Sequence, residues 1–498
     1  MTPRSAQPEL SEGQAVWRWF ALPLALYLAV HLVLRLMISQ SIGYDEAEQV
    51  VWSQSLAWGY GPQPPLYTWL LWGLVQVCGM SLFTLALMKT AVLAAIYVGL
   101  YLCARRLLPD TRLACLAVFS LLLMPLLAWG SLKGSTHSDL LCAIWLATFW
   151  VVLRLLEVGR TSSYLWLGVL AGLGMLSKYN YALFAAALLG AGLTLPGCRA
   201  RLLDRRLLLT FAVALVLVLP HAVWAIERRG MIENYLAMKM RDPETRSWLV
   251  GACGALGSLV YRLWGALVAP IAAWLVFFPP GRRHAGTPAG EPYQLLARFI
   301  VAAGVLVLFP IAGGTTHILS RWLQPLLVLV PLTFFARLDP ARLDPRRLRG
   351  FAAVLALAAL AVMAARVGQL WFGSDDGGRY RSRDLAFARS VARLQAAGFR
   401  GGVLISRDSL TGANLRLRFP RARLVCTDYP NCQTPPAPPG VPCVVVCNSG
   451  ASDQTPCLQE FLAPAFPAVV SMEAAASIAE QLEATGECCE PVKFAPLH

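Results

Sequence analysis

The chain has 498 residues, of which 57% are hydrophobic and 14% are charged, and its formal net charge is +15. Soluble domains carry about 25% charged residues, so this composition excludes an ordinary soluble protein. A basic excess can indicate nucleic-acid binding, but here the positive charge is confined to certain loops between apolar segments, so we expect no nucleic-acid partner.

Apolar stretches recur along the first three quarters of the chain, and most are long enough to cross a bilayer. The sequence therefore predicts a polytopic α-helical membrane protein with about 11 transmembrane helices. We expect that the first stretch is not a cleavable signal peptide, because it is too long and because acidic residues follow it where small residues would mark a cleavage site. The predicted spans are 16–38, 84–104, 112–129, 138–156, 164–177, 180–195, 207–226, 249–278, 299–312, 318–336 and 350–371.

Arginines cluster in alternate loops between these spans, and such loops are cytoplasmic by the positive-inside rule. Loop 39–83 and the residues after 371 then lie on the periplasmic side of a bacterial inner membrane. The net charge is explained by topology alone. The arginines that define the cytoplasmic side are Arg105, Arg106, Arg112, Arg154, Arg160, Arg199, Arg201, Arg205, Arg206, Arg282, Arg283, Arg298, Arg337, Arg342, Arg346, Arg347 and Arg349.

The first periplasmic loop begins with three carboxylates, Asp45, Glu46 and Glu48. Acidic groups are costly beside hydrocarbon, so such a cluster is typical of a functional site, although a solvated loop that ends the first span would also explain it. Residues 45–58 have helical periodicity, which predicts an interfacial helix with its apolar face in lipid and its acidic face toward a cavity. A proline-rich segment and a second apolar helix, 66–77, follow.

Further polar residues fall on or near the periplasmic side. Each has a structural interpretation beside the functional one: Asp139 could cap a helix, Lys178 could snorkel, and Arg321 could form an ion pair within the bundle. A capping or loop role for His317 is as plausible as a ligand role. The full set is His137, Asp139, Lys178, Lys239, Arg241, His317 and Arg321.

After residue 371 the pattern changes to alternating helix and strand, which predicts a small α/β domain over 372–498. The expected helices are 384–397 and 474–484, and the expected strands are 403–405, 424–426 and 443–446. Seven cysteines here permit disulfides in an oxidising compartment, with zinc ligation as the less favoured alternative. They are Cys426, Cys432, Cys443, Cys447, Cys457, Cys488 and Cys489.

This set of residues suits transfer of a group that is carried on a lipid phosphate. A carboxylate at the interface can accept a proton from an attacking hydroxyl, and nearby cations can hold the phosphate that leaves. The sequence contains no P-loop, no dinucleotide-binding glycine motif and no HExxH motif. A divalent metal ion stays open as a cofactor, since Asp45, Glu48 and a histidine could meet around one.

Several short motifs, in order, resemble those of GT-C membrane glycosyltransferases. They are Asp45-Glu46, Pro64-Pro65-Leu66-Tyr67, Asp139, the run Gly172 to Lys178, and Arg321-Trp322-Leu323-Gln324-Pro325. The resemblance covers residues 15 to 335. It is strongest to the bacterial branch of the protein O-mannosyltransferase superfamily, which includes aminoarabinose and galacturonic-acid transferases acting on lipopolysaccharide.

The resemblance implies a catalytic module over 1–371 that transfers a sugar, with inversion, from a polyprenyl phosphate to an envelope glycolipid or protein such as lipopolysaccharide. Asp45 and Glu46 would be catalytic. Lys178, Arg321 and His317 would bind the donor phosphate. Residues expected in the substrate cavity are Glu48, Gln63, Tyr67, Asp139 and Tyr179.

One position departs from the aminoarabinose branch, which carries a lysine where this chain has Gln63. This weakens the case for aminoarabinose as the donor sugar. A transporter or flippase of a lipid-linked sugar is the alternative function, and an envelope scaffold is a third. A transporter predicts inverted repeats, and the sequence shows no internal repeat.

Overall fold

The computed structural model describes residues 11–108, 110–130, 134–242, 245, 247–279, 290–340, 343–375, 378–396, 398–406, 408–426 and 443–446. Within them the chain forms two compact units. We call residues 11–31, 90–223 and 233–363 the bundle unit. We call residues 32–89 and 224–232, with the described residues after 363, the acidic-loop unit.

Within the described residues, seven helices are long and apolar enough to cross a membrane. They are Glu12–Ile38 (α1, η1 and α2), α5 Leu82–Leu107, α8 Thr136–Val158, α12 Leu207–Glu227, α14 Trp248–Phe277, Glu291–Ala312 (α15 and α16) and α19 Pro345–Phe372. Shorter apolar helices are α4 Leu66–Cys78, Thr111–Leu123 (α6 and η2), α9 Thr161–Ser177, α10 Tyr181–Leu193 and Gln324–Phe335 (α17 and α18).

Each of the eleven predicted spans coincides with one of these helices. Seven match the long helices, and 112–129, 164–177, 180–195 and 318–336 match shorter ones. The last of these is broken in the structure into α17 Gln324–Leu327 and α18 Val330–Phe335. Pro325 and Pro331 each stand near the start of one piece, where a missing N–H is tolerated. The number of membrane crossings stays a prediction.

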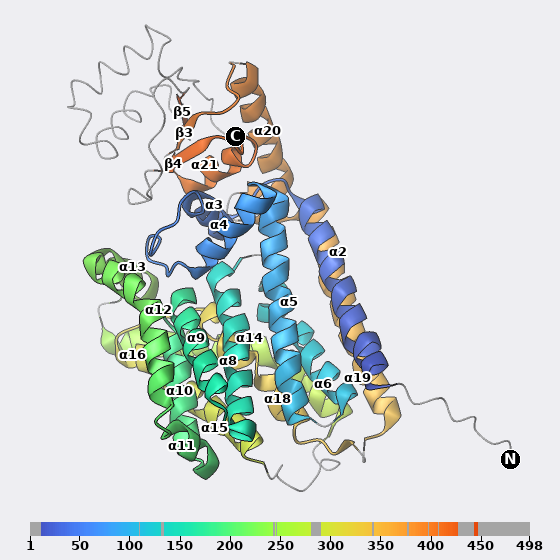
Figure 1. Cartoon of the computed structure of the whole chain (residues 1–498). Coiled ribbons are helices and arrows are strands. Elements are labelled where there is room, and N and C mark those ends of the chain that lie inside the picture. The colour runs from blue at the N-terminus through green and yellow to red at the C-terminus, as the bar shows by residue number, and fades with distance from the viewer. Residues whose placement is uncertain are drawn as a thin grey trace, which may run out of the picture. The chain divides into compact units, whose positions relative to one another are not determined.

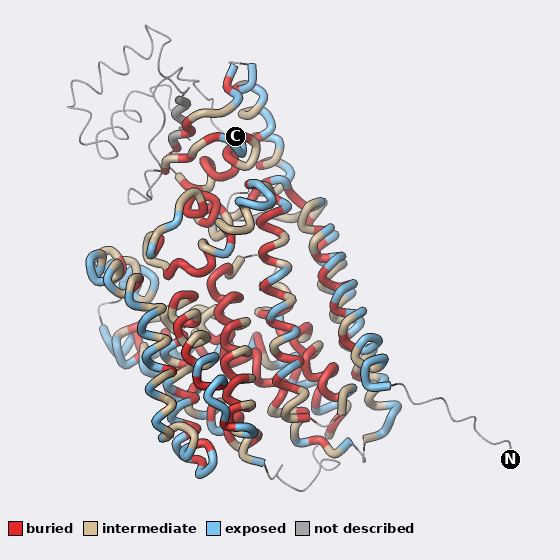
Figure 2. The backbone as a smooth tube through the Cα atoms, in the orientation of Figure 1, coloured by how far each residue is buried: buried red, intermediate tan, exposed pale blue. Residues whose placement is uncertain are grey.

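Helix α8 forms the centre of the bundle unit. Trp145, Leu146, Phe149 and Leu153 are fully buried, as expected for a helix surrounded by others. The Trp145 ring packs against Phe299 of α15 Glu291–Leu306, with 5.1 Å between ring centroids. Figure 2 shows α8 as largely buried backbone, whereas α12 carries many exposed residues.

Helix α12 instead exposes large apolar side chains, which is the surface that a lipid-facing helix presents. Phe211, Leu215, Leu219 and Ile226 are among the large hydrophobic residues that are exposed. Helix α13 Arg229–Met240 follows and precedes α14. The bundle unit also contains three short elements, which are η3 Leu126–Gly130, α11 Pro196–Leu202 and η5 Ser320–Trp322.

The acidic-loop unit contains α3 Tyr44–Trp52, α4 and the described C-terminal elements. Those elements are β1 Ser374–Asp375, β2 Gly378–Arg379, α20 Tyr380–Ala396, β3 Val403–Ser406, α21 Ser409–Arg416, β4 Arg423–Cys426 and β5 Cys443–Val446. Strands β4, β3 and β5 pair in that order, all parallel, with Val403 opposite both Arg423 and Cys443. In Figure 1, α21 lies between this sheet and α3.

The strands expected near 403, 424 and 443 are therefore present, and the helix expected at 384–397 is α20. Helix α21 was not expected from the sequence. The helix expected at 474–484, and every C-terminal cysteine except Cys426 and Cys443, lie outside the described residues. Cys426 is buried, and its thiol donates to the Asp408 carbonyl at 3.9 Å.

Candidate active site

The acidic cluster lies at the beginning of α3, which is shorter than predicted and ends at Trp52 instead of residue 58. Asp45 and Glu46 occupy its first turn, where the unpaired N–H groups of a helix favour negative charge. Asp45 and Glu48 are half-buried. The segment thus presents two partly accessible carboxylates from one short helix.

From its periodicity we expected the apolar face of α3 to lie in lipid. In the structure this face is covered by protein. Ala47, Val50 and Val51 are at most 1% exposed, and α3 packs against α21. The same spacing of apolar residues serves either environment, so the pattern alone could not distinguish protein from lipid. The interfacial-helix prediction is wrong on this point.

Glu46 is held in an ion pair. Its carboxylate accepts from the Arg35 guanidinium at 2.9 Å and from the Gly43 N–H at 3.4 Å. Arg35 also donates to the backbone carbonyls of Ser39 and Ser41. Glu46 therefore joins the end of α2 Leu22–Ile38 to the start of α3, which is an architectural task in addition to any chemical one.

The proline-rich segment after α3 forms a tight turn in which Tyr60 and Gln63 pair through both backbone groups. Gln63 is half-buried, and Tyr67, in the first turn of α4, is 4% exposed. Gln49 accepts a hydrogen bond from Thr68 at 2.8 Å, which ties α3 to α4. The expected cavity residues Glu48, Gln63 and Tyr67 thus belong to the same unit as Asp45.

The other expected site residues, Asp139, Lys178, Tyr179, His317 and Arg321, belong to the bundle unit. Lys178 follows the last residue of α9, and its ammonium group donates to the Ser138 hydroxyl in the first turn of α8. The neighbouring Asp139 is fully buried and accepts from the Gln324 amide at 3.3 Å. The structure therefore brings Lys178, Asp139 and the start of α17 into one polar cluster.

Backbone strain marks the start of α8. Ser135 has φ 72°, and it is the single non-glycine residue with positive φ among the described residues. Residues other than glycine rarely adopt this conformation, and it tends to occur where function constrains the backbone. Ser135 directly precedes the turn that carries His137, Ser138 and Asp139, of which each is at most 6% exposed.

Tyr179 lies against a histidine that the sequence analysis did not select. Its hydroxyl is 3.1 Å from Nε2 of His221, and the two rings stack with 5.8 Å between centroids. His221 is buried within α12, directly after Pro220. An ionisable residue in an otherwise apolar span was a usable signal for this position.

The segment 313–323 carries His317 and Arg321. Arg321 lies in the 3-10 turn η5 that precedes α17, not one turn inside a continuous span. The segment is held by hydrogen bonds from Arg241 to the Gly313 carbonyl at 3.0 Å and from the Thr316 N–H to the Met240 carbonyl at 2.9 Å. Arg241 therefore has a structural task.

Arg321 is half-buried, and among the described residues it forms no hydrogen bond or ion pair. A guanidinium in that state can accept an anionic partner without first breaking another contact. His317 is also half-buried, and its Nδ1 is 3.3 Å from the Thr316 hydroxyl.

The described residues contain no group of three His, Cys, Asp or Glu side chains placed to hold a metal ion. The arrangement of Asp45, Glu48 and a histidine that we considered is therefore not formed there.

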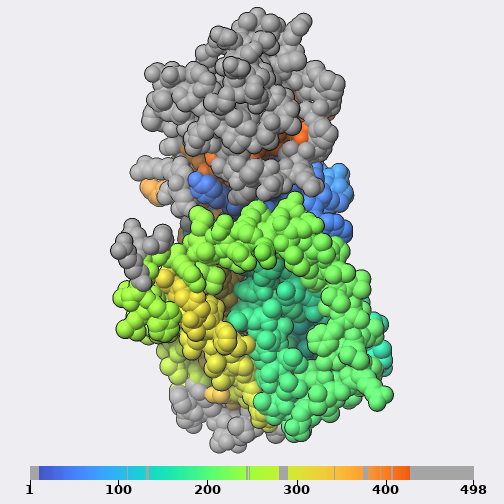
Figure 3. Space-filling model, turned by 90° about the vertical axis from the view of Figure 1, so that its left-hand side faces the viewer, coloured from blue at the N-terminus to red at the C-terminus, as the bar shows by residue number. Residues whose placement is uncertain are grey.

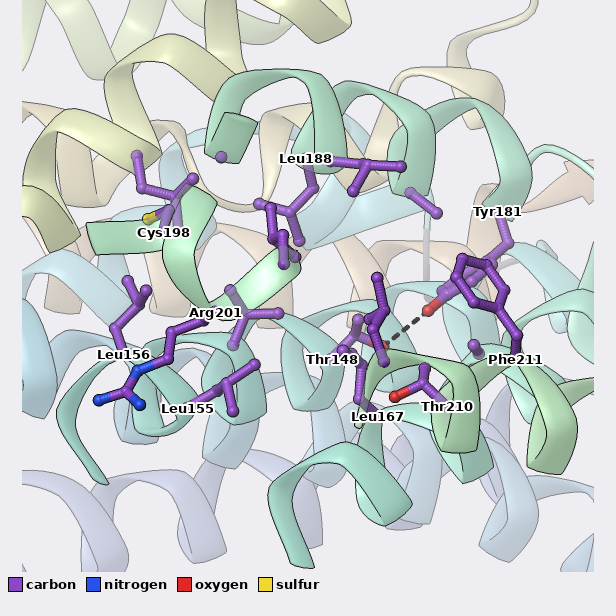
Figure 4. Close-up of a pocket in the computed structure, with 18 residues that line it drawn as sticks. Thr148, Leu155, Leu156, Leu167, Tyr181, Leu188, Cys198, Arg201, Thr210 and Phe211 are labelled. Atoms are coloured by element: carbon purple, nitrogen blue, oxygen red, sulfur yellow. Dashed lines mark hydrogen bonds between the residues drawn. The ribbon is translucent and has the colours of Figure 1, made fainter. Parts of the chain in front are cut away.

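An apolar pocket in the bundle unit is separate from these residues. Its lining comes from α8 to α12 and α15, with Arg201 at one end and the Thr148–Tyr181 hydrogen bond, 3.1 Å, at the other (Figure 4). Figure 3 shows the face of the bundle unit on which α10, α12 and α15 lie. The residues that line the pocket include no carboxylate and none of the expected site residues.

Comparison with known proteins defines the class. Residues 62–224 match the family model of dolichyl-phosphate-mannose-protein mannosyltransferases. The chain is 33% identical to the lipopolysaccharide core galacturonosyltransferase RgtB of Rhizobium johnstonii over 416 residues, which is 83% of each chain. The fold is similar to that of ArnT from Cupriavidus metallidurans in its apo state, with TM-score 0.60 and 15% identity over 82% of this chain and 86% of ArnT. ArnT bound to undecaprenyl phosphate gives TM-score 0.56 and 17% identity over 82% and 85%.

The helical fold, with its long apolar helices, is that of a multi-pass membrane glycosyltransferase. Identity of 33% over most of both chains is sufficient to assign the family. The chain belongs to the GT-C family of membrane glycosyltransferases, as its motifs had suggested.

Proposed function

We propose that this protein transfers a sugar, with inversion at the anomeric carbon, from a polyprenyl-phosphate donor to an acceptor in the bacterial envelope. The observation that carries the proposal is the 33% identity to a lipopolysaccharide core galacturonosyltransferase. It favours a uronic acid as the sugar and the lipopolysaccharide core as the acceptor. The bound undecaprenyl phosphate in the related fold of ArnT supports a lipid-phosphate donor.

The reaction takes place on the periplasmic face of the inner membrane in this proposal. The support is the confinement of arginines to alternate loops, which the positive-inside rule makes cytoplasmic. The first loop and the C-terminal segment then share the periplasmic side. Nucleotide-activated sugars are absent from that compartment, so a lipid-borne donor suits it.

Asp45 acts as the general base. The acceptor hydroxyl gives its proton to the Asp45 carboxylate while its oxygen attacks the anomeric carbon from the face opposite the phosphate. The bond between the anomeric carbon and the phosphate oxygen breaks, and its electron pair stays on the phosphate. Glu46 is the second carboxylate of the site, although its ion pair with Arg35 makes it less available than Asp45 as a proton acceptor.

Lys178, Arg321 and His317 hold the donor phosphate and stabilise the charge that develops as it leaves. A phosphate held by cations is a good leaving group and needs no separate acid. The support for Arg321 is its lack of a hydrogen-bond or ion-pair partner in the described part of the chain. Lys178 already donates to Ser138 and would share that contact with the phosphate.

Two alternatives are less well supported. Membership of a glycosyltransferase family disfavours a transporter or flippase, which would perform no chemistry. Aminoarabinose as the donor sugar is disfavoured by Gln63, which replaces the lysine expected in that branch.

The test is mass spectrometry of lipopolysaccharide from matched cells with the gene, without it, and with the gene restored as wild type or Asp45→Asn. We expect the core to lose one hexuronic acid when the gene is absent, and only the wild type to restore it. Loss of an aminoarabinose, or an unchanged core with a change in another glycan, would contradict the assigned sugar or acceptor.

A further inference from the structure

The segment that carries Asp45 is joined on both of its sides to residues near the end of the described chain. Residues 39–42 precede Asp45 and contact α20 and α21. Residues 50–54 follow it and contact α21 and β4. All of these residues belong to the acidic-loop unit.

Before Asp45, two C-terminal side chains bind the backbone and hydroxyl groups of the loop. The Asp384 carboxylate accepts from the Ser39 hydroxyl at 2.9 Å, from the Gln40 N–H at 3.1 Å, and from the Ser41 hydroxyl. Asn414 accepts from the Ile42 N–H at 2.9 Å and donates to the Ile42 carbonyl at 3.3 Å. Asn414 thus occupies both backbone groups of a residue three positions before Asp45.

After Asp45, an arginine and a glutamine form similar side-chain to backbone hydrogen bonds. Arg416 donates to the Val50 carbonyl in the last turns of α3. The Gln54 amide accepts from the Leu424 N–H at 2.8 Å and donates to the Leu424 carbonyl at 2.9 Å. The two amides, Asn414 and Gln54, are reciprocal: each binds both backbone groups of one residue on the opposite segment.

The contacts of Asn414 with Ile42 and of Arg416 with Val50 are buried, and buried hydrogen bonds are costly to leave unmade. Asn414 is 0% exposed, Arg416 is 7% exposed, and Ile42 is 0% exposed. Helix α21 also sits close on its sheet, because a Cβ at Gly412 would lie 2.6 Å from a Leu424 methyl carbon. Helix α21 is therefore fixed by the sheet on one side and contacts α3 on the other.

We infer that α20, α21 and β4 are a positioning platform for the catalytic base, and that Asn414 and Arg416 set the position of Asp45 without touching substrate. The inference rests on the proposed role of Asp45. It assigns a task to the C-terminal segment within the same reaction. Because a misplacement of about 1 Å can cost on the order of 10²-fold in rate, loosening this platform should reduce turnover strongly.

The platform acts on the base, whereas the cations assigned to the donor phosphate belong to the bundle unit. A loosened platform should therefore lower kcat and leave KM for the polyprenyl-phosphate donor nearly unchanged. A general loss of folding would lower the amount of active enzyme and the thermal midpoint together.

The experiment uses the full-length protein in detergent or nanodiscs and compares Asn414→Leu, Arg416→Met and Arg416→Lys with the wild type. Arg421→Met is the matched control, since Arg421 is an exposed arginine in the turn between α21 and β4. Three quantities are measured: hydrogen–deuterium exchange of the amides in 42–52, and the kcat and KM with a polyprenyl-phosphate uronic acid.

We expect faster exchange of 42–52 and a kcat lower by about tenfold or more for Asn414→Leu and Arg416→Met, with KM for the donor unchanged. Arg416→Lys keeps a donor for the Val50 carbonyl and should recover part of the rate. Arg421→Met should match the wild type in both measurements. If Asn414→Leu accumulates poorly, the double variant Ser39→Ala, Ser41→Ala removes the two hydroxyl contacts to Asp384, leaves the one from the Gln40 N–H, and does not alter α21.

Unchanged exchange of 42–52 in these variants would overturn the platform. Faster exchange with unchanged kcat would show that the platform holds α3 but does not set the position of Asp45 for turnover. If the wild type itself transfers no sugar from polyprenyl-phosphate donors, the proposed function fails, while the exchange result still decides whether the C-terminal segment holds α3.

Discussion

Arg35 and Glu46 form an ion pair with 2.9 Å between nitrogen and oxygen, and their side chains are only 13% and 18% exposed. Because of this ion pair, the adjacent acids Glu46 and Asp45 have different roles. Glu46 is engaged in joining α2 to α3, whereas Asp45 occupies the same first turn as the proposed base. The two residues should therefore respond differently to loss of charge.

For Glu46 the expected effect is on stability. Glu46→Gln and Arg35→Met should each lower the free energy of unfolding by about 1.5–3 kcal/mol, as is typical of a hydrogen bond to a charged group. The double variant should cost less than the sum of the two, because the second change finds the pair already broken. Thermal midpoints in detergent measure this, and strict additivity would show that the pair does not contribute.

For Asp45 the expected effect is on turnover. Asp45→Asn keeps the shape of the side chain but removes its capacity to accept a proton, so kcat should fall by about 10²-fold or more. The thermal midpoint should change little. Glu48→Gln, one turn further along α3, is the matched control and should lose less activity. An Asp45→Asn enzyme that turns over at the wild-type rate would transfer the role of base to Glu46 or Glu48.

Lys178→Met and Arg321→Met should each weaken binding of the polyprenyl-phosphate donor about tenfold or more, since a charge-assisted contact contributes about 1.5–3 kcal/mol. Arg321→Met should leave the thermal midpoint unchanged, because Arg321 has no ion-pair or hydrogen-bond partner among the described residues. Ser138→Ala removes the group that Lys178 contacts and controls for that hydrogen bond. Normal donor affinity with a large fall in midpoint would return both cations to a structural role.

Substitution of Gly59 by alanine tests the packing of the first loop. A Cβ at Gly59 would lie 2.3 Å from a ring carbon of Trp224, so Gly59→Ala should destabilise the protein by about 1–3 kcal/mol. Gly73 in α4 is the control, since nothing lies within 4 Å of its Cβ position. Gly73→Ala should be neutral or stabilising by about 0.5–1 kcal/mol, as alanine favours helix. Equal midpoints for the two variants would show that the Trp224 contact does not restrict position 59.

The proposed topology predicts a periplasmic C-terminal segment. Alkaline phosphatase fused after His498 should be active, because it needs an oxidising compartment to form its disulfides. A reporter that works only in the cytoplasm should be silent at the same junction. The reverse result would place the acidic helix in the cytoplasm and remove the basis for a lipid-borne donor.

The sequence predicted most of the helices and the strands around 403, 424 and 443, because long apolar runs and short β-branched runs are local signals. It also located the acidic turn and Lys178. It could not predict what covers α3, since Ala47, Val50 and Val51 would look the same in lipid as against α21. It missed α21 itself, a short helix of mixed composition whose clearest local signal is the Asp408 cap.

Other differences have similar physical causes. Arg321 was placed inside a continuous helix, but Pro325 and Pro331 divide that stretch and leave the arginine in a 3-10 turn. His221 was overlooked because its neighbours in α12 are apolar, although a buried polar ring needs a partner and finds one in Tyr179. For α3 and His221 the decisive contact comes from a residue far away in the sequence, whereas for Arg321 the cause is the two prolines that follow it.

The hydrogen bonds between Asn414 and Ile42 join residues that are 372 positions apart in the chain. During synthesis the ribosome produces the acidic turn long before it produces α21. Helix α3 can therefore reach its packed position only after the C-terminal segment has been made, because loops of this length must close before their contacts form. A chain that stopped before Asn414 would retain its apolar helices and its acidic residues and still lack an ordered base. Helix α3 can therefore take its packed position only once synthesis has passed Asn414.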